Sequence, residues 1–302
     1  MTANAAGSPQ VSPGFLGRFL VLRGATPELW LVFAIKFFNF AAYAMSTFAL
    51  KLWLSHELGF SDRSAMVIIT AWAVTMSCTV LMVGAFTDAI GLRRSFFVGI
   101  VVCLVARAVM VLAPVPWVAI AFGMFPLAVG EALGTPVLVA SVRKYSTTAQ
   151  RSMAFSIIYM VANIGNILAL YLFDLIHVSV GEQGHVTIPG LGISVSVYRS
   201  MFLASFVLEL LMVPLVWRLR PGVEVVDDQV QVVPPVVKAR VAGWVGIFFG
   251  AVQDSLRETS RLFRLLVKQK QFYRLMLFLL LIAFLKVIFM QMTFLFAELG
   301  QR

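Results

Sequence analysis

Apolar residues are gathered into seven long runs, separated by shorter stretches that carry most of the polar side chains. A helix needs roughly 20 residues to cross the hydrocarbon core of a bilayer, and each run is about that long. The pattern therefore predicts seven membrane-spanning helices. We place them near residues 29–54, 64–86, 95–113, 117–140, 153–176, 198–217 and 272–297.

The composition agrees with a membrane protein. Hydrophobic residues make up 60% of the chain and charged residues 13%, whereas an ordinary soluble domain carries about 25% charged residues. Both cysteines, Cys78 and Cys103, lie inside apolar runs, so we expect neither a structural disulfide nor a metal site. No serine-hydrolase or Walker-type motif occurs. We therefore expect an all-α membrane protein that is not an enzyme and holds no cofactor.

Basic residues are distributed unevenly between the two sets of connections, which predicts the orientation in the membrane. One set contains Arg18, Arg23, Arg93, Arg94, Arg143, Lys144 and Arg151. Because cytoplasmic loops carry the excess of Lys and Arg, the segment 1–28 is predicted to be cytoplasmic. This asymmetry and contact with membrane lipids account for the net charge of +10, so no nucleic-acid partner is expected.

The sequence after the sixth run changes character. "RPGVEVVDDQVQVVPPVV" is rich in Pro and Val and is interpreted as an extended linker. Residues 243–274 place apolar and basic side chains on opposite faces of a predicted helix, which suits an anionic membrane surface or packing on the protein itself. The predicted organisation is a six-helix half at 29–217, a cytoplasmic linker at 218–271, and a seventh helix at 272–302 that begins a second half.

The short connection "GAFTDAIGLRRSFF", residues 84–97, lies between the second and third runs. Its spacing of Gly84, Asp88, Gly91, Arg93 and Arg94 resembles the loop signature of the major facilitator superfamily. The resemblance implies a twelve-helix transporter, of which this chain would be an incomplete part, and a gating role for Asp88 and Arg93. A basic turn that serves only membrane topology is the alternative.

Two further stretches are similar to the proton-coupled oligopeptide transporters. They are "KFFNFAAYAMSTFALKLWLSHELGFSD" in the first helix and "SIIYMVANIGNILA" in the fifth. Where that family has two glutamates and an arginine in the first helix, this chain has Lys36, Asn39 and Phe40. Where the family has a lysine in the fourth helix, this chain has Glu131. These departures favour the superfamily fold without a peptide substrate.

Charged residues inside the predicted spans are candidates for a functional site, because each costs about 2.5–3.5 kcal/mol at the centre of a helix. They are Lys36, Arg107, Glu131, Glu209 and Lys286. From the predicted span ends, Lys36 and Glu131 lie roughly 11 and 14 Å deep at 1.5 Å per residue. We therefore predict that these two pair across a central cavity; a pair that only fixes helix packing is the alternative.

Asn39 and Tyr43 share one helix face with Lys36, which predicts a polar stripe on the first span. Lys286 lies near the middle of the seventh span, where it either faces the cavity or snorkels to the surface. The predicted function is secondary active transport of a small solute by alternating access, coupled to an ion or to protons. A seven-helix receptor or sensor is the alternative, although the inward N-terminus and the long 218–271 insertion favour a transporter.

Overall fold

The computed structural model describes residues 19–181, 184–187, 192–220, 222–226 and 229–232, and, nearer the C-terminus, 253, 261, 265, 267–278, 280–282 and 284–285. The chain forms two compact units, Met1–Ile247 and Phe248–Arg302. Their boundary falls inside the segment that the sequence predicts to be a linker. The predicted amphipathic helix within 243–274 lies largely outside the described residues.

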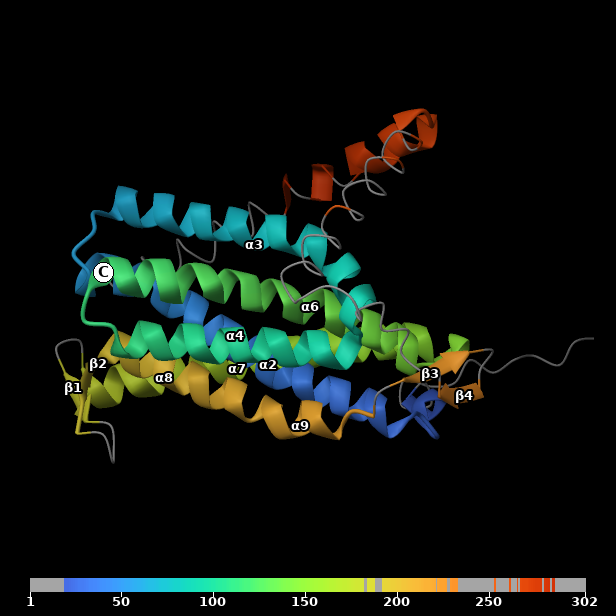
Figure 1. Ribbon diagram of the computed structural model, residues 1–302, viewed down its shortest axis with the longest axis horizontal. Helices are drawn as coiled ribbons and strands as arrows, with labels where there is room; N and C mark the ends of the chain where they lie inside the picture. The colour runs from blue at the N-terminus through green and yellow to red at the C-terminus, as the bar shows by residue number, and fades with distance from the viewer. Residues whose placement is uncertain are drawn as a thin grey trace, which may run out of the picture. The chain divides into compact units, whose positions relative to one another are not determined.

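Six helices of the first unit are long and apolar enough to cross a membrane, which confirms six of the predicted spans. They run side by side in Figure 1. The helical segments are α2 (Pro27–Leu52) with the π-helical turn η2 (Trp53–Glu57), α3 (Asp62–Ile90), α4 (Leu92–Leu112), α5 (Pro116–Val118) with η3 (Ala119–Met124) and α6 (Phe125–Tyr145), α7 (Thr148–Val180), α8 (Val197–Leu210) and α9 (Met212–Arg218). A short 3-10 turn, η1 (Leu20–Leu22), precedes them.

Local sequence signals set the ends of these helices. Thr147 and Gln150 form a capping box at the start of α7, and the Ser196 hydroxyl accepts a hydrogen bond from the backbone of Arg199 at the start of α8. Gly91 separates α3 from α4 with φ of +86°, a conformation that other residues rarely adopt. The short connection between the second and third spans is therefore a tight turn at this glycine.

The long helices approach one another closely. A Cβ atom at Gly165 of α7 would lie 2.6 Å from the Phe37 carbonyl oxygen of α2, and one at Gly130 of α6 would lie 2.5 Å from the Cys103 sulfur of α4. Small residues allow such contacts in membrane bundles, where packing replaces the hydrophobic drive. The backbones of α2 and α7, and of α4 and α6, are held together in this way.

The described core consists mainly of two apolar clusters, one toward each end of the helices. The proximal cluster, at the end where α2 begins and α6 finishes, includes Leu29, Leu138 and Val216. The distal cluster, at the end that carries η2, includes Trp53 and Phe202. Between the two clusters the helices carry the polar residues of the candidate site.

Two short antiparallel hairpins join or follow the helices: β1 (His185–Thr187) with β2 (Ser194–Ser196), and β3 (Val223–Val226) with β4 (Gln229–Val232). Figure 1 shows them at opposite ends of the bundle. The second hairpin corrects the expectation of an extended linker, because valines flanking Asp227 and Asp228 favour paired strands.

Residues 270–278, 280–282 and 284–285 of the second unit are helical, within the region of the predicted seventh span. Lys286 lies outside the described residues.

Candidate functional site

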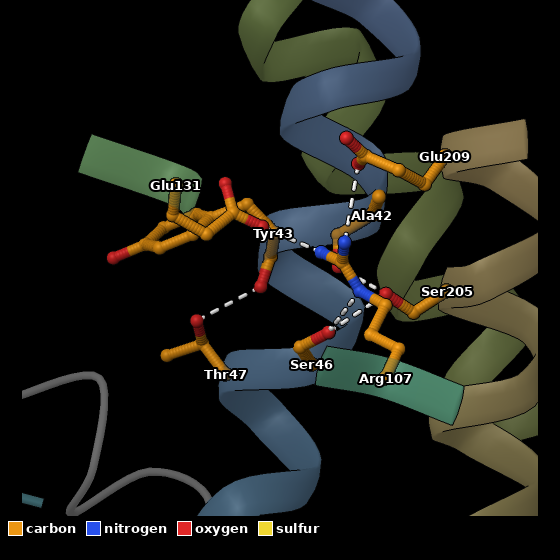
Figure 2. Close-up of polar contacts among 8 residues, drawn as sticks. All are labelled: Ala42, Tyr43, Ser46, Thr47, Arg107, Glu131, Ser205 and Glu209. Carbon is orange, nitrogen blue, oxygen red and sulfur yellow. Dashed lines mark hydrogen bonds and ion pairs between the residues drawn. The ribbon is translucent and has the colours of Figure 1, made fainter. Parts of the chain in front are cut away.

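A buried arginine on α4 forms the centre of the site. Arg107 is 0% exposed, and its guanidinium lies 2.5 Å from Glu131 on α6 and 3.2 Å from Glu209 on α8, which are 3% and 1% exposed (Figure 2). The two terminal nitrogens of the guanidinium thus each donate to a different carboxylate. One cation is shared by two acids that come from two other helices.

Two serines extend this network to the first span. The Nε atom of Arg107 donates to the Ser46 hydroxyl at 3.2 Å, and the Ser46 and Ser205 hydroxyls lie 2.7 Å apart. Ser205 also donates to the Ala42 carbonyl at 2.8 Å. Hydrogen bonds therefore connect α2, α4, α6 and α8 in the middle of the bundle, as Figure 2 shows. We call Ser46, Arg107, Glu131, Ser205 and Glu209 the central network.

The predicted ion pair between Lys36 and Glu131 is wrong. Glu131 bonds to Arg107, and no ion pair within 4.0 Å joins Lys36 to Glu131 among the described residues. The ammonium instead lies over the Phe40 ring, 4.9 Å from its centroid. Lys36 still lies within electrostatic reach of Glu131.

The depth argument failed because α6 continues to Tyr145, five residues beyond the predicted end of the fourth span. Glu131 is fourteen residues from Tyr145, roughly 21 Å along the helix, whereas Lys36 is nine residues from Pro27, roughly 14 Å. Arg107 is fifteen residues from Leu92, roughly 22 Å. Arg107 therefore matches the depth of Glu131, and Lys36 does not.

The other members of the predicted stripe on α2 lie against α6 and α3. Asn39 is buried, and its amide nitrogen would be 3.2 Å from a Cβ atom at Gly134 of α6. The ring of Tyr43 stacks on Trp72 of α3, with centroids 6.5 Å apart and planes 18° apart. Lys36, Asn39 and Tyr43 thus follow one face of α2 beside the central network.

The connection between α3 and α4 is partly described. Gly84 lies within α3, and Arg93 at the start of α4 donates to the Trp217 carbonyl of α9 at 2.9 Å. Arg94 is exposed. The side chain of Asp88 is outside the described residues, so its predicted gating contact stays a prediction.

A second arginine cluster, which was not predicted from the sequence, lies at the distal end. Arg199 at the start of α8 contacts Glu57 at 2.5 Å and donates to the Val111 carbonyl at 3.1 Å. Glu57 also accepts from the Ser196 hydroxyl at 2.5 Å. In the sequence, Arg199 can be recognised only as a charge at the edge of a span. Its pairing with Glu57 could not be predicted, because the two residues are far apart along the chain. We call Glu57, Ser196 and Arg199 the distal clamp.

Within the described residues, no group of three or more His, Cys, Asp or Glu side chains is placed to hold a metal ion. The chemistry that the central site offers is charge and hydrogen bonding toward a solute or ion.

A model of the Major Facilitator Superfamily matches residues 32–301. No curated protein sequence matches the chain. Among solved structures, a peptide transporter POT in complex with sulfate has a TM-score of 0.57 and 16% identity, over 80% of this chain and 46% of that one. A bacterial homologue of the human drug peptide transporters PepT1 and PepT2 has a TM-score of 0.54 and 17% identity, over 87% of this chain and 54% of that one. The chain thus spans about half the length of these structures.

Proposed function

Because the chain belongs to the major facilitator superfamily, we propose that it acts in secondary active transport of a small solute by alternating access. The observation that carries the proposal is the central network. Arg107, Glu131 and Glu209 are embedded in spans where a charge costs about 2.5–3.5 kcal/mol, and such residues mark solute and ion pathways.

The solute site that we propose is built on α2 and α6, next to the central network. Its members are Lys36, Asn39, Tyr43 and Glu131. Lys286 stays a separate candidate, because it lies outside the described residues. Inverted or repeated halves of such transporters enclose their solute near the middle of the membrane. The chain spans about half the length of the solved peptide transporters that it resembles.

Coupling to an ion or to protons is part of the proposal. Two carboxylates share one guanidinium in the central network, and Lys36 supplies a further charge within reach of Glu131. An ion or a charged solute that binds next to these groups alters the electrostatic interactions among them. The same chemistry supports the choice of a small solute as partner, in addition to membrane lipids.

Alternating access is tested without knowledge of the solute by labelling a cysteine at Tyr43. In a Cys78→Ser, Cys103→Ala background, Tyr43→Cys should react with an impermeant maleimide from either face of the membrane, in right-side-out and inside-out vesicles. Ala44→Cys, one residue away and buried, is the matched control and should stay unlabelled. Labelling of Tyr43→Cys from one face only would favour the receptor or sensor alternative.

We further propose that residues 1–28 and 218–271 are cytoplasmic and that Asp88 and Arg93 act in gating. Cysteines at Ala5 and Gln229 should resist an impermeant reagent applied outside sealed cells. Asp88→Asn keeps the size of the side chain while removing its charge. Asp88→Asn should slow the conversion between the state in which Tyr43→Cys is labelled from one face and the state in which it is labelled from the other. An unchanged rate of conversion would contradict the gating role.

A further inference from the structure

Lys36 lies inside the bundle without an acceptor for its ammonium. The side chain is 6% exposed, and its described contacts are the Phe40 ring and the more distant charge of Glu131. No hydrogen bond or ion pair of Lys36 occurs among the residues that the structure describes. A buried cation normally has a counter-ion, because the desolvation of an unpaired charge is costly. This one therefore requires an explanation.

Neighbouring acids do not supply the missing partner. The formal charges of Lys36, Arg107, Glu131 and Glu209 sum to zero, but both described carboxylate contacts go to Arg107. A contact with an aromatic ring attracts the ammonium, but it does not neutralise the charge as a buried counter-ion would. The ammonium is thus left as a donor that faces no acceptor in the described bundle.

A second buried donor without a partner belongs to α3 and lies next to Tyr43, on the face of α2 that carries Lys36. Trp72 of α3 is 4% exposed, and its indole N–H has no hydrogen-bond partner. More than nine in ten buried polar groups are hydrogen-bonded, so each exception points to strain, solvent or an absent ligand. Trp72 stacks on Tyr43, which in turn lies 5.9 Å from Phe40, the ring beneath Lys36.

These four side chains form one continuous strip. It begins at the ammonium, continues over Phe40 and Tyr43, and ends at the indole N–H of Trp72. Lys36 and Tyr43 are seven residues apart on α2, roughly 10 Å along its axis. The strip therefore offers a cation at one end, aromatic faces in the middle and a neutral donor at the other end.

We propose that Lys36, Phe40, Tyr43 and Trp72 bind an organic solute that carries a carboxylate at one end and a hydrogen-bond acceptor toward the other. Lys36 binds the carboxylate, the rings of Phe40 and Tyr43 pack on the apolar body, and the Trp72 indole donates to the acceptor. This binding site rests on the proposed transport function and defines the chemical class of its solute.

Three matched probes separate these contacts. 4-Acetylbenzoate has both the carboxylate and the acceptor, 4-isopropylbenzoate has only the carboxylate, and 4-acetylbenzamide lacks the negative charge. Binding to the full chain in an uncharged detergent is measured by intrinsic tryptophan fluorescence and by the shift in melting temperature. Because a hydrogen bond to a charged group is worth more than a neutral one, wild type should bind 4-acetylbenzamide about tenfold more weakly than 4-acetylbenzoate.

Substitutions at each end of the strip should act on different probes. Lys36→Met should weaken both benzoates by about tenfold and 4-acetylbenzamide by less, because the amide oxygen accepts a weaker hydrogen bond from the ammonium than a carboxylate does. Trp72→Phe should weaken 4-acetylbenzoate by about fivefold and leave 4-isopropylbenzoate unchanged, since only the first has the acceptor. Trp53→Phe is the control, because Trp53 is also buried with an unpartnered indole N–H but packs on Phe202, away from this strip.

Folding and binding are separated by the unliganded variants. Without ligand, Lys36→Met should melt at the same temperature as wild type or higher, because it removes a buried charge that has no counter-ion. A marked drop would show that Lys36 has a structural partner and would overturn the site. Unchanged benzoate affinity in Lys36→Met, equal affinity for 4-acetylbenzamide, or no binding of any probe would also overturn it.

The outcome is distinguishable from failure of the transport proposal. If Tyr43→Cys is labelled from one face only while 4-acetylbenzoate still binds through Lys36, transport fails and the binding site stands. If labelling alternates while no probe binds, the binding site fails and transport stands. If inorganic phosphate competes as strongly as 4-acetylbenzoate, the strip recognises negative charge alone. That result would overturn the proposal that the solute is an organic carboxylate.

Discussion

The central network and the distal clamp are built from the same groups but in different surroundings. In the centre, Arg107 is 0% exposed between Glu131 and Glu209. In the distal clamp, Arg199 and Glu57 are 18% and 17% exposed. Water can replace part of a lost contact in the clamp, whereas in the centre an abandoned charge has no substitute partner. The same ion pair should therefore matter far more in the middle of the bundle than at its end.

The distal clamp and the central network also differ in their structural roles. The clamp holds η2, the end of α4 and the start of α8 together, so it shapes one end of the bundle. The central network connects α2, α4, α6 and α8 at the level where charges are most costly. None of its described hydrogen bonds involves α3 or α7. These two helices are therefore held by packing, which for α7 includes the close backbone approach to α2 at Gly165.

Loss of the central arginine should have the largest effect. Arg107→Met leaves Glu131 and Glu209 buried without their cation, which typically costs about 3–5 kcal/mol. The yield of monodisperse protein and the melting temperature in detergent should both fall sharply. Adding Glu131→Gln and Glu209→Gln to Arg107→Met should restore most of the loss, since neutral amides need no cation. A loss below about 1 kcal/mol in the single variant would contradict the view of the network as a buried ion cluster.

The choice of partner for Glu131 gives the next test. A double-mutant cycle of Arg107→Met with Glu131→Gln should show a coupling energy above about 1 kcal/mol, because the two groups are in direct contact. The cycle of Lys36→Met with Glu131→Gln should stay within about 0.5 kcal/mol of additivity. Denaturation in mixed micelles measures both. An equally large coupling for Lys36 would restore the direct pair that the sequence favours.

Features that depend on neighbouring residues could be predicted from the sequence, whereas contacts between residues far apart in the chain could not. The six spans were predicted because bilayer thickness imposes a length on each apolar run, and that signal is local. The turn at Gly91 is likewise local, because a positive φ is a property of one residue. The network was not predicted, because a partner in another helix depends on the depth and rotation of both helices.

The wrong partner predicted for Glu131 shows how strongly such a prediction depends on the predicted end of a span. A span end misplaced by five residues at Tyr145 moved Glu131 by roughly 7 Å, enough to exchange one basic partner for another. Arg107 and Glu209 were recognised as costly charges, yet their sequence separation of about one hundred residues gave no indication that they meet. The predicted stripe of Lys36, Asn39 and Tyr43 was closer to the structure, because it lies on a single helix whose periodicity is regular.

Breaking the distal clamp should have a moderate effect. Glu57→Gln removes the negative charge beside Arg199, but the guanidinium keeps the Val111 carbonyl and contact with water. We expect a loss of about 1 kcal/mol, well below that of Arg107→Met. Melting temperatures of the two variants, measured side by side, test the ranking. Ser196→Ala removes both the hydrogen bond to Glu57 and the N-cap of α8, so its loss sets an upper limit for that neutral contact. A loss from Glu57→Gln equal to that from Arg107→Met would show that exposure does not decide the cost.

The smallest effect is expected at the proximal end, where Arg220 is 66% exposed and contacts Glu28 at 2.6 Å. Glu28 is itself 2% exposed and its Oε2 atom has no hydrogen-bond partner, but it lies in the first turn of α2, where the helix dipole favours a negative charge. Arg220→Gln should therefore cost only about 0.5 kcal/mol, and the difference from wild type should vanish as the salt concentration rises. The loss from Arg107→Met should persist at the same salt concentration, because a buried cluster is screened far less. Arg94→Gln, an exposed arginine at the start of α4, is the control for removing a surface charge. A salt-independent loss in Arg220→Gln would mean that burial of the carboxylate alone sets the cost, and that exposure of the arginine does not reduce it.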